Sequence, residues 1–192
     1  MDINAFFNAE FDEHTDVVAK TRAACTDGFA DLLARCTQSI RHGGKIIFFG
    51  NGGSAADCQH LATELTIRYK TDRAPIAAIA LTTDTSALTA GGNDLGFENI
   101  FARQIEALGK PGDVAIGIST SGNSENVIRA LQTAQALDIV PAALSGKDGG
   151  RLVGIADPLI VVPSDTTARI QEMHITLGQM LCGALEIELG LV

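Results

Sequence analysis

The pattern of apolar residues after Gly44 constrains the fold of this chain more than any other feature. Five short apolar runs alternate there with stretches whose apolar residues recur every three or four positions. The runs are 45–49, 76–81, 114–118, 140–144 and 159–162, and the helical stretches are 54–69, 85–91 with 96–108, 125–137, 149–155 and 167–189. Continuous runs indicate parallel strands buried on both faces. The order predicts a doubly wound α/β fold, a three-layer sandwich around a five-stranded parallel sheet.

The first 42 residues are predicted to be helical. From about residue 13 to residue 42 the apolar residues fall at steps of three and four, which indicates one helix that ends at Gly43 and Gly44. A shorter helical segment ahead of it carries Phe6, Phe7 and Phe11, an apolar face that another element or another subunit has to cover. We expect a single domain over residues 1–192, with N-terminal helices in 1–42 and the α/β core in 43–192.

Composition excludes several classes of partner. The formal charge of −9 argues against nucleic acid, because binding to a phosphate backbone requires a basic face. No apolar run approaches the ~18 residues that span a bilayer, so no membrane partner is expected. The four cysteines are scattered, which indicates reduced thiols, and the first residues lack the basic start and cleavage site of a signal peptide. A cytoplasmic protein is the expectation.

A glycine-rich loop follows the first predicted strand. It reads Gly50-Asn51-Gly52-Gly53-Ser54. Glycines allow a sharp turn and a close approach to a ligand, and Ser54 is suited to cap the next helix. Taken alone, a plain turn with an N-cap explains the loop equally well. The spacing matches neither the dinucleotide-binding fingerprint nor the P-loop.

A serine-rich loop follows the third predicted strand. Ser119, Thr120, Ser121 and Ser124 supply four hydroxyls around Gly122, at the start of the helix predicted from Glu125. This combination brings hydroxyl donors, free backbone N–H groups and the positive end of a helix dipole to one point. A polar turn needs fewer hydroxyls. The loop therefore predicts a site for a phosphate monoester.

Two helices carry further candidate groups. His60 and Glu64 lie four residues apart on one helical face, and Arg68 continues the row. Such a pair either holds a metal, divides acid and base work, or is an exposed pair with no role. On the last helix Gln171 and Gln179 lie about 80° apart by ~3.6 residues per turn, so that both are able to serve one site. His174 lies on a different face and is expected to be structural.

Five motifs in order resemble the sugar isomerase (SIS) superfamily over nearly the whole chain. They are Gly50-Asn51-Gly52-Gly53-Ser54, Gly92-Asn93-Asp94, Ser119-Thr120-Ser121-Gly122-Asn123-Ser124, Gly146-Lys147-Asp148-Gly149-Gly150 and Arg169-Ile170-Gln171-Glu172. Each motif alone is weak, and their order and spacing together are specific. Within the superfamily the chain is most similar to isomerases of seven-carbon sugar phosphates.

The resemblance implies an activity and a site. The expected reaction converts sedoheptulose 7-phosphate to D-glycero-D-manno-heptose 7-phosphate for bacterial heptose synthesis, in a homotetramer with active sites at subunit interfaces. Glu64 is the expected base in an enediol mechanism. The expected zinc ligands are His60, Glu64, Gln171 and the residue at 179. The expected substrate contacts are Asn51, Gly52, Gly53, Ser54, Glu64, Arg68, Asn93, Asp94, Ser119, Thr120, Ser121, Ser124 and Gln171.

The chain departs from that pattern at Gln179, where the resemblance leads us to expect a histidine that is both a metal ligand and the second acid/base. Glutamine can ligate through its carbonyl oxygen, but it cannot carry a proton as imidazole does. Water, Asp94 or His60 remain candidates for the second acid/base. Two alternatives stay open: a non-catalytic SIS module that binds sugar phosphate or associates with a replication initiator, and an isomerase of another sugar phosphate. Relatives of the first kind lack a carboxylate at the position of Glu64.

Overall fold

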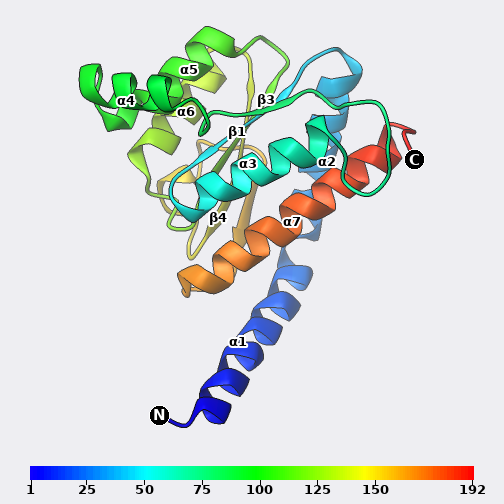
Figure 1. Ribbon diagram of the computed structural model, residues 1–192, viewed down its shortest axis with the longest axis vertical. Helices are drawn as coiled ribbons and strands as arrows, with labels where there is room; N and C mark the ends of the chain where they lie inside the picture. The colour runs from blue at the N-terminus through cyan, green and yellow to red at the C-terminus, as the bar shows by residue number, and fades with distance from the viewer.

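A five-stranded parallel sheet with helices on both faces forms the centre of the computed structural model, which describes residues 1–192 (Figure 1). The strands are β1 Ile46–Gly50, β2 Ala78–Ala80, β3 Val114–Ser119, β4 Val140–Gly146 and β5 Leu159–Val162, in the order β2-β1-β3-β4-β5. The predicted fold class is therefore confirmed. The chain leaves β1 toward β2 and later returns to β3 on its other side. Open parallel sheets bind ligands at such a switch, outside the carboxyl ends of the strands.

Helices cover the sheet in two layers. They are α1 Ile3–Ala24, α2 Thr26–Arg41, α3 Gly53–Thr66, α4 Thr85–Asp94, α5 Ile100–Leu108, α6 Glu125–Ala136 and α7 Thr167–Glu188, with one-turn 3-10 helices η1 Phe97–Asn99 and η2 Gly150–Leu152. Alternate residues of β1 point into different cores: Phe48 packs with residues of α1, α2, α3 and α7, and Phe49 packs with residues of α5 and α6. Successive side chains of a strand face opposite sides, which explains why the strands read as continuous apolar runs.

The prediction of one helix over residues 13–42 is wrong. The chain forms two helices that meet at Cys25, whose φ of −105° and ψ of 1° are not helical, and the segment with three phenylalanines is the first part of α1. Val17 of α1 and Leu32 of α2 both enter the same core, and the Cys25 thiol donates to Val161 O at 3.4 Å. Because the chain bends at Cys25, the apolar faces of both α1 and α2 pack against the α/β core. One straight helix of this length would not place both faces there.

The helix predicted over residues 149–155 is also wrong, because only the single turn η2 forms there. Gly149, Gly150 and Gly154 all have positive φ, at 84°, 54° and 82°. These conformations are incompatible with a right-handed helix and are readily adopted only by glycine. Residues 147–149 instead form a tight loop between β4 and η2.

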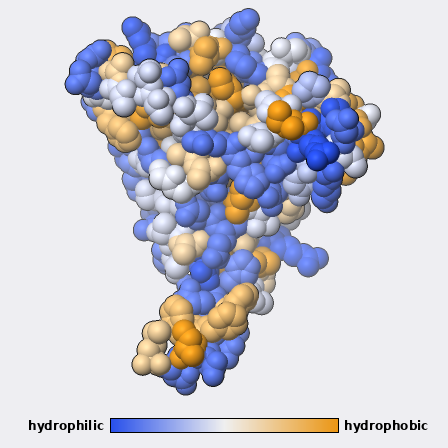
Figure 2. Space-filling view, viewed as in Figure 1, coloured by the Kyte–Doolittle hydropathy of each residue, from blue (hydrophilic) through white to orange (hydrophobic).

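The first part of α1 projects from the body (Figure 1). Its apolar face is left bare, and apolar side chains gather at the projecting tip (Figure 2). Ile3, Phe6, Phe7 and Phe11 are each more than half exposed. No other element of the chain covers this face. Among all the helices, none has both the length and the apolar character needed to cross a membrane.

Candidate active site

The serine-rich loop joins the end of β3 to the start of α6. Ser119 is the buried last residue of β3, and its Oγ lies 3.1 Å from the Oγ of Ser124, the N-cap of α6. The Ser124 side chain makes no capping bond. Val127 and Ile128 donate to Ser124 O, so the N–H groups of Glu125 and Asn126 have no acceptor in the chain. Hydroxyls and free N–H groups thus converge at the positive end of α6, as an anion site requires.

The shape of this loop is fixed by the loop after β4. Gly122 has a φ of 67°, and a Cβ placed on it would overlap the carbonyl of Gly149. The Asn123 side chain donates to Ser121 O at 2.8 Å and accepts from Arg151 N at 3.2 Å. The two loops are therefore interlocked through backbone contacts, and the hydroxyls are held in place before any ligand arrives.

The glycine-rich loop is tied to the same helix. Asn51 and Asn126 exchange two side-chain hydrogen bonds of 2.8 Å, which connect the end of β1 to the first turn of α6. Ser54 is not the N-cap of α3: Gly52 is, with a φ of 56°, and Ser54 is buried inside the first turn. The helix already begins at Gly53, so Ser54 lies inside it and cannot be its cap. Asn126 was not among the predicted site residues, and its only signal is a buried amide in the first turn of an apolar helix.

His60 and Glu64 lie together on α3. His60 Nε2 is 2.9 Å from Glu64 Oε1, and Gln179 Nε2 of α7 is 3.5 Å from His60 Nε2. The His60 side chain is 47% exposed and that of Glu64 is 21% exposed. A half-turn of the Gln179 amide brings its carbonyl oxygen to the same place, since the two ends of an amide are alike in shape. Three polar groups from two helices therefore meet at one exposed point.

Arg68 does not continue this row, as the sequence suggested. Helix α3 ends at Thr66, and Arg68 is exposed beyond its end. The cause is Arg73, whose guanidinium donates to the carbonyls of Glu64 and Leu65 at 2.7 and 2.8 Å. Arg73 is itself paired with Glu186 of α7 at 2.8 Å, and both side chains are almost fully buried. This ion pair caps α3 and joins it to α7, and sequence spacing carried no signal for it.

Gln171 and Gln179 reach different parts of the seam between α3 and α7. A Cβ on Gly53 would overlap the Gln171 amide, so Gln171 lies at the start of α3, and Gln179 lies beside His60 further along. Eight residues of helix separate the two glutamines by about 12 Å along the axis. In one chain, therefore, Gln171 lies next to the glycine-rich loop, while only Gln179 contacts His60.

Asn93 and Asp94 lie in the last turn of α4 and are exposed. Asn93 Nδ2 donates to Asp94 Oδ1 at 2.7 Å. Asp94 shares a surface hollow with Arg103 of α5. No hydrogen bond or ion pair links either residue to the serine-rich loop or to His60.

Two titratable groups with shifted pKa values, the buried His174 and the half-buried Asp57, lie close to these elements. His174 of α7 is fully buried, its Nε2 lies 2.9 Å from Ser145 O at the end of β4, and burial lowers its pKa to about 4. It is therefore a neutral structural residue, as we expected from its position on a different face of the last helix. Burial raises the pKa of Asp57 on α3, and the nearby His60 opposes that effect. Asp57 was not among the predicted site residues.

The side chains around His60 offer few ligands for a metal ion. No three His, Cys, Asp or Glu side chains come together anywhere in the chain, so a metal here requires a glutamine ligand. Imidazole and carboxylate are ordinary zinc ligands, and an amide oxygen is a weaker one. His60, Glu64 and Gln179 fit a divalent metal on these terms, with Gln179 as the weakest donor.

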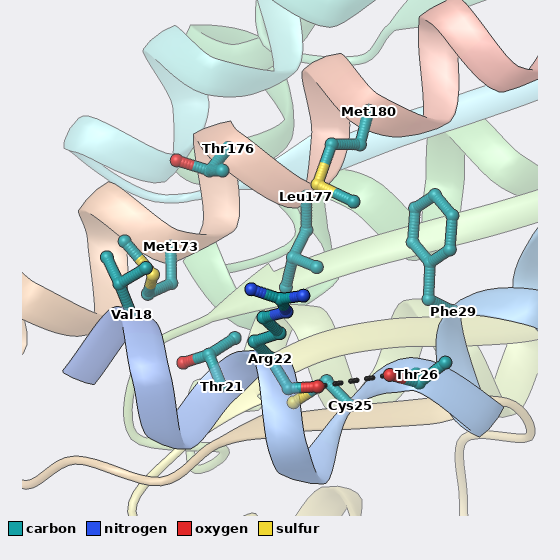
Figure 3. A pocket seen from close by; sticks show the side chains of 10 residues that line it. All are labelled: Val18, Thr21, Arg22, Cys25, Thr26, Phe29, Met173, Thr176, Leu177 and Met180. Atoms are coloured by element: carbon teal, nitrogen blue, oxygen red, sulfur yellow. Dashed lines mark hydrogen bonds between the residues drawn. The ribbon is translucent and has the colours of Figure 1, made fainter. Parts of the chain in front are cut away.

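An apolar groove of about 330 Å³ lies elsewhere, between α7 and the junction of α1 with α2. Met173, Leu177 and Met180 of α7 face Val18 and Phe29 across it (Figure 3). None of its lining residues belongs to the serine-rich loop or to the His60–Glu64 pair. The groove is therefore distinct from the polar site.

Comparisons with known proteins agree with this geometry. The SIS domain family matches residues 10–146. The phosphoheptose isomerase of Paramagnetospirillum magneticum is 56% identical over 186 residues, 97% of each chain. Solved phosphoheptose isomerases superpose closely: that of Neisseria gonorrhoeae has a TM-score of 0.90 at 42% identity, covering 96% of this chain and 99% of its own. That of Francisella tularensis has a TM-score of 0.94 at 34% identity, covering 97% and 100%. The chain belongs to the SIS domain family and, within it, to the phosphoheptose isomerases.

Proposed function

We propose that the chain is an aldose–ketose isomerase that converts sedoheptulose 7-phosphate to D-glycero-D-manno-heptose 7-phosphate for bacterial heptose synthesis. One observation carries the proposal: the Asn51–Asn126 pair joins the phosphate-binding loop to the loop that starts α3, the helix carrying Glu64. The anchor and the base thus belong to one rigid frame. The relatives compared above are named as isomerases, and nothing supports the non-catalytic alternative.

The residues divide the work by their positions. Ser119, Thr120, Ser121 and Ser124 with the α6 N-terminus hold the phosphate. Glu64 removes a proton from C1 of the ketose and returns it to C2 through an enediol, which requires a carboxylate fixed over both carbons. Gln179 carries no proton, so the oxygen-bound proton moves through His60 or through water.

We also propose zinc as the cofactor, held by His60, Glu64 and Gln179, with Gln171 as the ligand that the resemblance adds. Zinc supplies a Lewis acid for the sugar carbonyl. The Asn51, Gly52, Gly53 and Ser54 loop lies beside Gln171 and is proposed to line the sugar, together with Arg68, Asn93 and Asp94. Zinc content after purification, measured by elemental analysis with and without chelator, tests the metal without reference to activity.

Deuterium incorporation tests the reaction directly. The protein is incubated with sedoheptulose 7-phosphate in deuterated water, once with zinc and once with chelator. We expect product and deuterium at C1 or C2 with zinc, because the proton removed by Glu64 exchanges with solvent. Absence of both turnover and exchange in both conditions would contradict the isomerase proposal.

We propose that the chain works as a homotetramer with active sites at subunit interfaces. Three features support this: the bare face of α1, the apolar groove beside α7, and the lack of any contact from Asn93 and Asp94 to the His60 face within one chain. Copies of the chain are the simplest cover for these surfaces, and residues 1–192 then act as one domain. Four buried free thiols also suit the reducing cytoplasm, where we place the enzyme.

Light scattering after size-exclusion chromatography tests this assembly. We expect the mass of four chains, and dissociation when Phe7→Glu and Phe11→Glu place charges on the bare face. Ala9→Glu is the matched control, since residue 9 is about 200° round the helix from residue 7. A monomeric wild-type protein, or dissociation by the control alone, would contradict the proposal.

A further inference from the structure

A carboxylate lies at the positive end of the helix that is proposed to hold the phosphate. Glu125 is the first residue of α6, directly after Ser124. A negative side chain in the first turn is favourable for the free helix, because it faces the positive end of the dipole. It is unfavourable for a bound phosphate dianion, since two like charges then share one pole.

Two arginines occupy the two oxygens of this carboxylate. Arg151 Nη1 is 2.6 Å from Glu125 Oε2, and Arg129 Nε is 2.9 Å from Glu125 Oε1. The hydrogen bond from Arg151, followed by that from Arg129, holds the pKa of Glu125 below its usual range. Glu125 therefore stays charged, and its charge is balanced at both oxygens.

The two arginines come from different parts of the chain. Arg129 is one turn along α6 itself and is also held by Asn99 Oδ1 at 2.9 Å. Arg151 arrives from η2, and its backbone N–H donates to Asn123 Oδ1 in the serine-rich loop. Arg151 thus binds the loop by its backbone and Glu125 by its side chain. Arg129 reaches Glu125 but has no contact with the serine-rich loop.

The exposure of these groups argues against a role in stability alone. The side chains of Arg151 and Glu125 are 58% and 41% exposed. Exposed ion pairs contribute little to folding, because water and salt screen their charges. The Glu125–Arg151 pair lies between the serine-rich loop and the loop that braces it. It should therefore affect the affinity for an anionic ligand more than the stability of the fold.

We propose that Arg151 is a positioning residue for the phosphate group: it draws the Glu125 carboxylate toward η2 and balances its charge, so that the end of α6 accepts a dianion. Arg151 acts through Glu125 and does not contact the phosphate. The identity of the phosphate ester rests on the proposed function, whereas the role of Arg151 applies to any phosphate at this loop.

Four variants test this role: Arg151→Ala, Arg151→Lys, Glu125→Gln and the Arg151→Ala/Glu125→Gln double variant. The KM for sedoheptulose 7-phosphate and the Kd of inorganic phosphate by calorimetry are both measured. We expect Arg151→Ala to raise both values about ten-fold and to change kcat less than about two-fold, because the carboxylate, then paired with Arg129 alone, repels the dianion more strongly. Arg151→Lys restores part of the loss, and the loss shrinks at high salt.

The decisive comparison is made in the Glu125→Gln background. There Arg151→Ala should raise KM and Kd less than about two-fold, since no charge is left to uncover. Arg35→Ala on α2, an exposed arginine paired with Asp31, controls for the loss of one positive charge. Melting temperatures show that each variant is folded.

Two outcomes would overturn the inference. A full ten-fold loss in the Glu125→Gln background would show that Arg151 contacts the phosphate directly, and an equal loss in Arg35→Ala would reduce the effect to net charge. Calorimetry with inorganic phosphate requires no turnover. A wild-type protein without turnover but with this pattern of phosphate affinities would therefore refute the isomerase proposal and leave the role of Arg151 intact.

Discussion

The two ends of the candidate site are built in different ways. At the phosphate end, hydroxyls follow a fully buried strand, and backbone contacts between Gly122 and Gly149 fix the loop. At the reacting end, side chains of two helices meet near the surface, with His60 almost half exposed and 3.5 Å from Gln179. The groups proposed to hold the phosphate all come from one chain. The reacting end depends on side-chain identity and on the surfaces that neighbouring copies are proposed to cover.

This difference indicates where each property of the enzyme is encoded. The proposed phosphate binding depends on hydroxyls that the backbone of two interlocked loops holds in place, and few substitutions alter that backbone without strain. Chemistry is set by a few exposed side chains, which a single substitution changes. Variants at the two ends should therefore separate binding from turnover.

The largest expected effect is at Glu64. Glu64→Gln keeps the size of the side chain but removes the base, and we expect turnover to fall about 10³-fold or more. The Kd of inorganic phosphate should change less than about two-fold, because the serine-rich loop is untouched. Glu106→Gln, an exposed carboxylate paired with Arg103 on α5, is the control. Full activity in Glu64→Gln would show that another group is the base.

Gly122→Ala should weaken phosphate binding at the other end of the site, in the serine-rich loop. An alanine there has an unfavourable positive φ and drives its Cβ into the Gly149 carbonyl, so that the two loops must separate. We expect the Kd of inorganic phosphate to rise at least about ten-fold, a larger loss than any change in kcat at saturation. Gly43→Ala is a matched control, since Gly43 has a φ of 80° with open space around it. Equal phosphate affinity in both variants would contradict the proposed brace.

Gln179→His tests whether one side chain at the reacting end determines the affinity for zinc. Imidazole replaces a weak amide donor beside His60, and we expect zinc affinity to rise on the order of ten-fold, measured by competition with a chelating dye. Gln135→His on the exposed side of α6 controls for a surface histidine. Unchanged zinc affinity would show that residue 179 does not face the metal.

The sequence predicted the fold and the place of the serine-rich loop between a strand and a helix, because both depend on local patterns. Continuous apolar runs mark buried strands, and the change to a helical period after the loop marks the start of α6. The errors arose where distant residues decide the outcome. Helix α3 stops at Thr66, where Arg73 donates to the carbonyls of Glu64 and Leu65 and is itself held by Glu186 of α7. The break at Cys25 likewise depends on packing against β5.

The missed site residues share the same cause. Asn126 gains its role from Asn51, which lies 75 positions earlier, and Arg151 gains its role from Asn123 and Glu125 in a neighbouring loop. No spacing rule links these positions, because the sheet order alone brings them together. Asn93 and Asp94 are the converse case: they stand out in the sequence, yet in one chain their side chains hydrogen-bond only to each other.

At His174 the expected effect is on stability rather than on binding or turnover, and this residue joins the two ends. This imidazole connects α7 to the carbonyl of Ser145 at the end of β4, one residue before the loop that braces the phosphate site. Its pKa is about 4 in the folded protein and 6.5 when unperturbed, so between these values the unfolded chain binds a proton that the folded chain does not. The free energy of unfolding should therefore decrease as pH falls from 6.5 toward 4, by up to about 1.4 kcal/mol per pH unit. Urea unfolding of wild type, His174→Gln and the exposed control His42→Gln measures this slope. Only His174→Gln should flatten it, and an equal slope in all three would assign the loss at low pH to carboxylates instead.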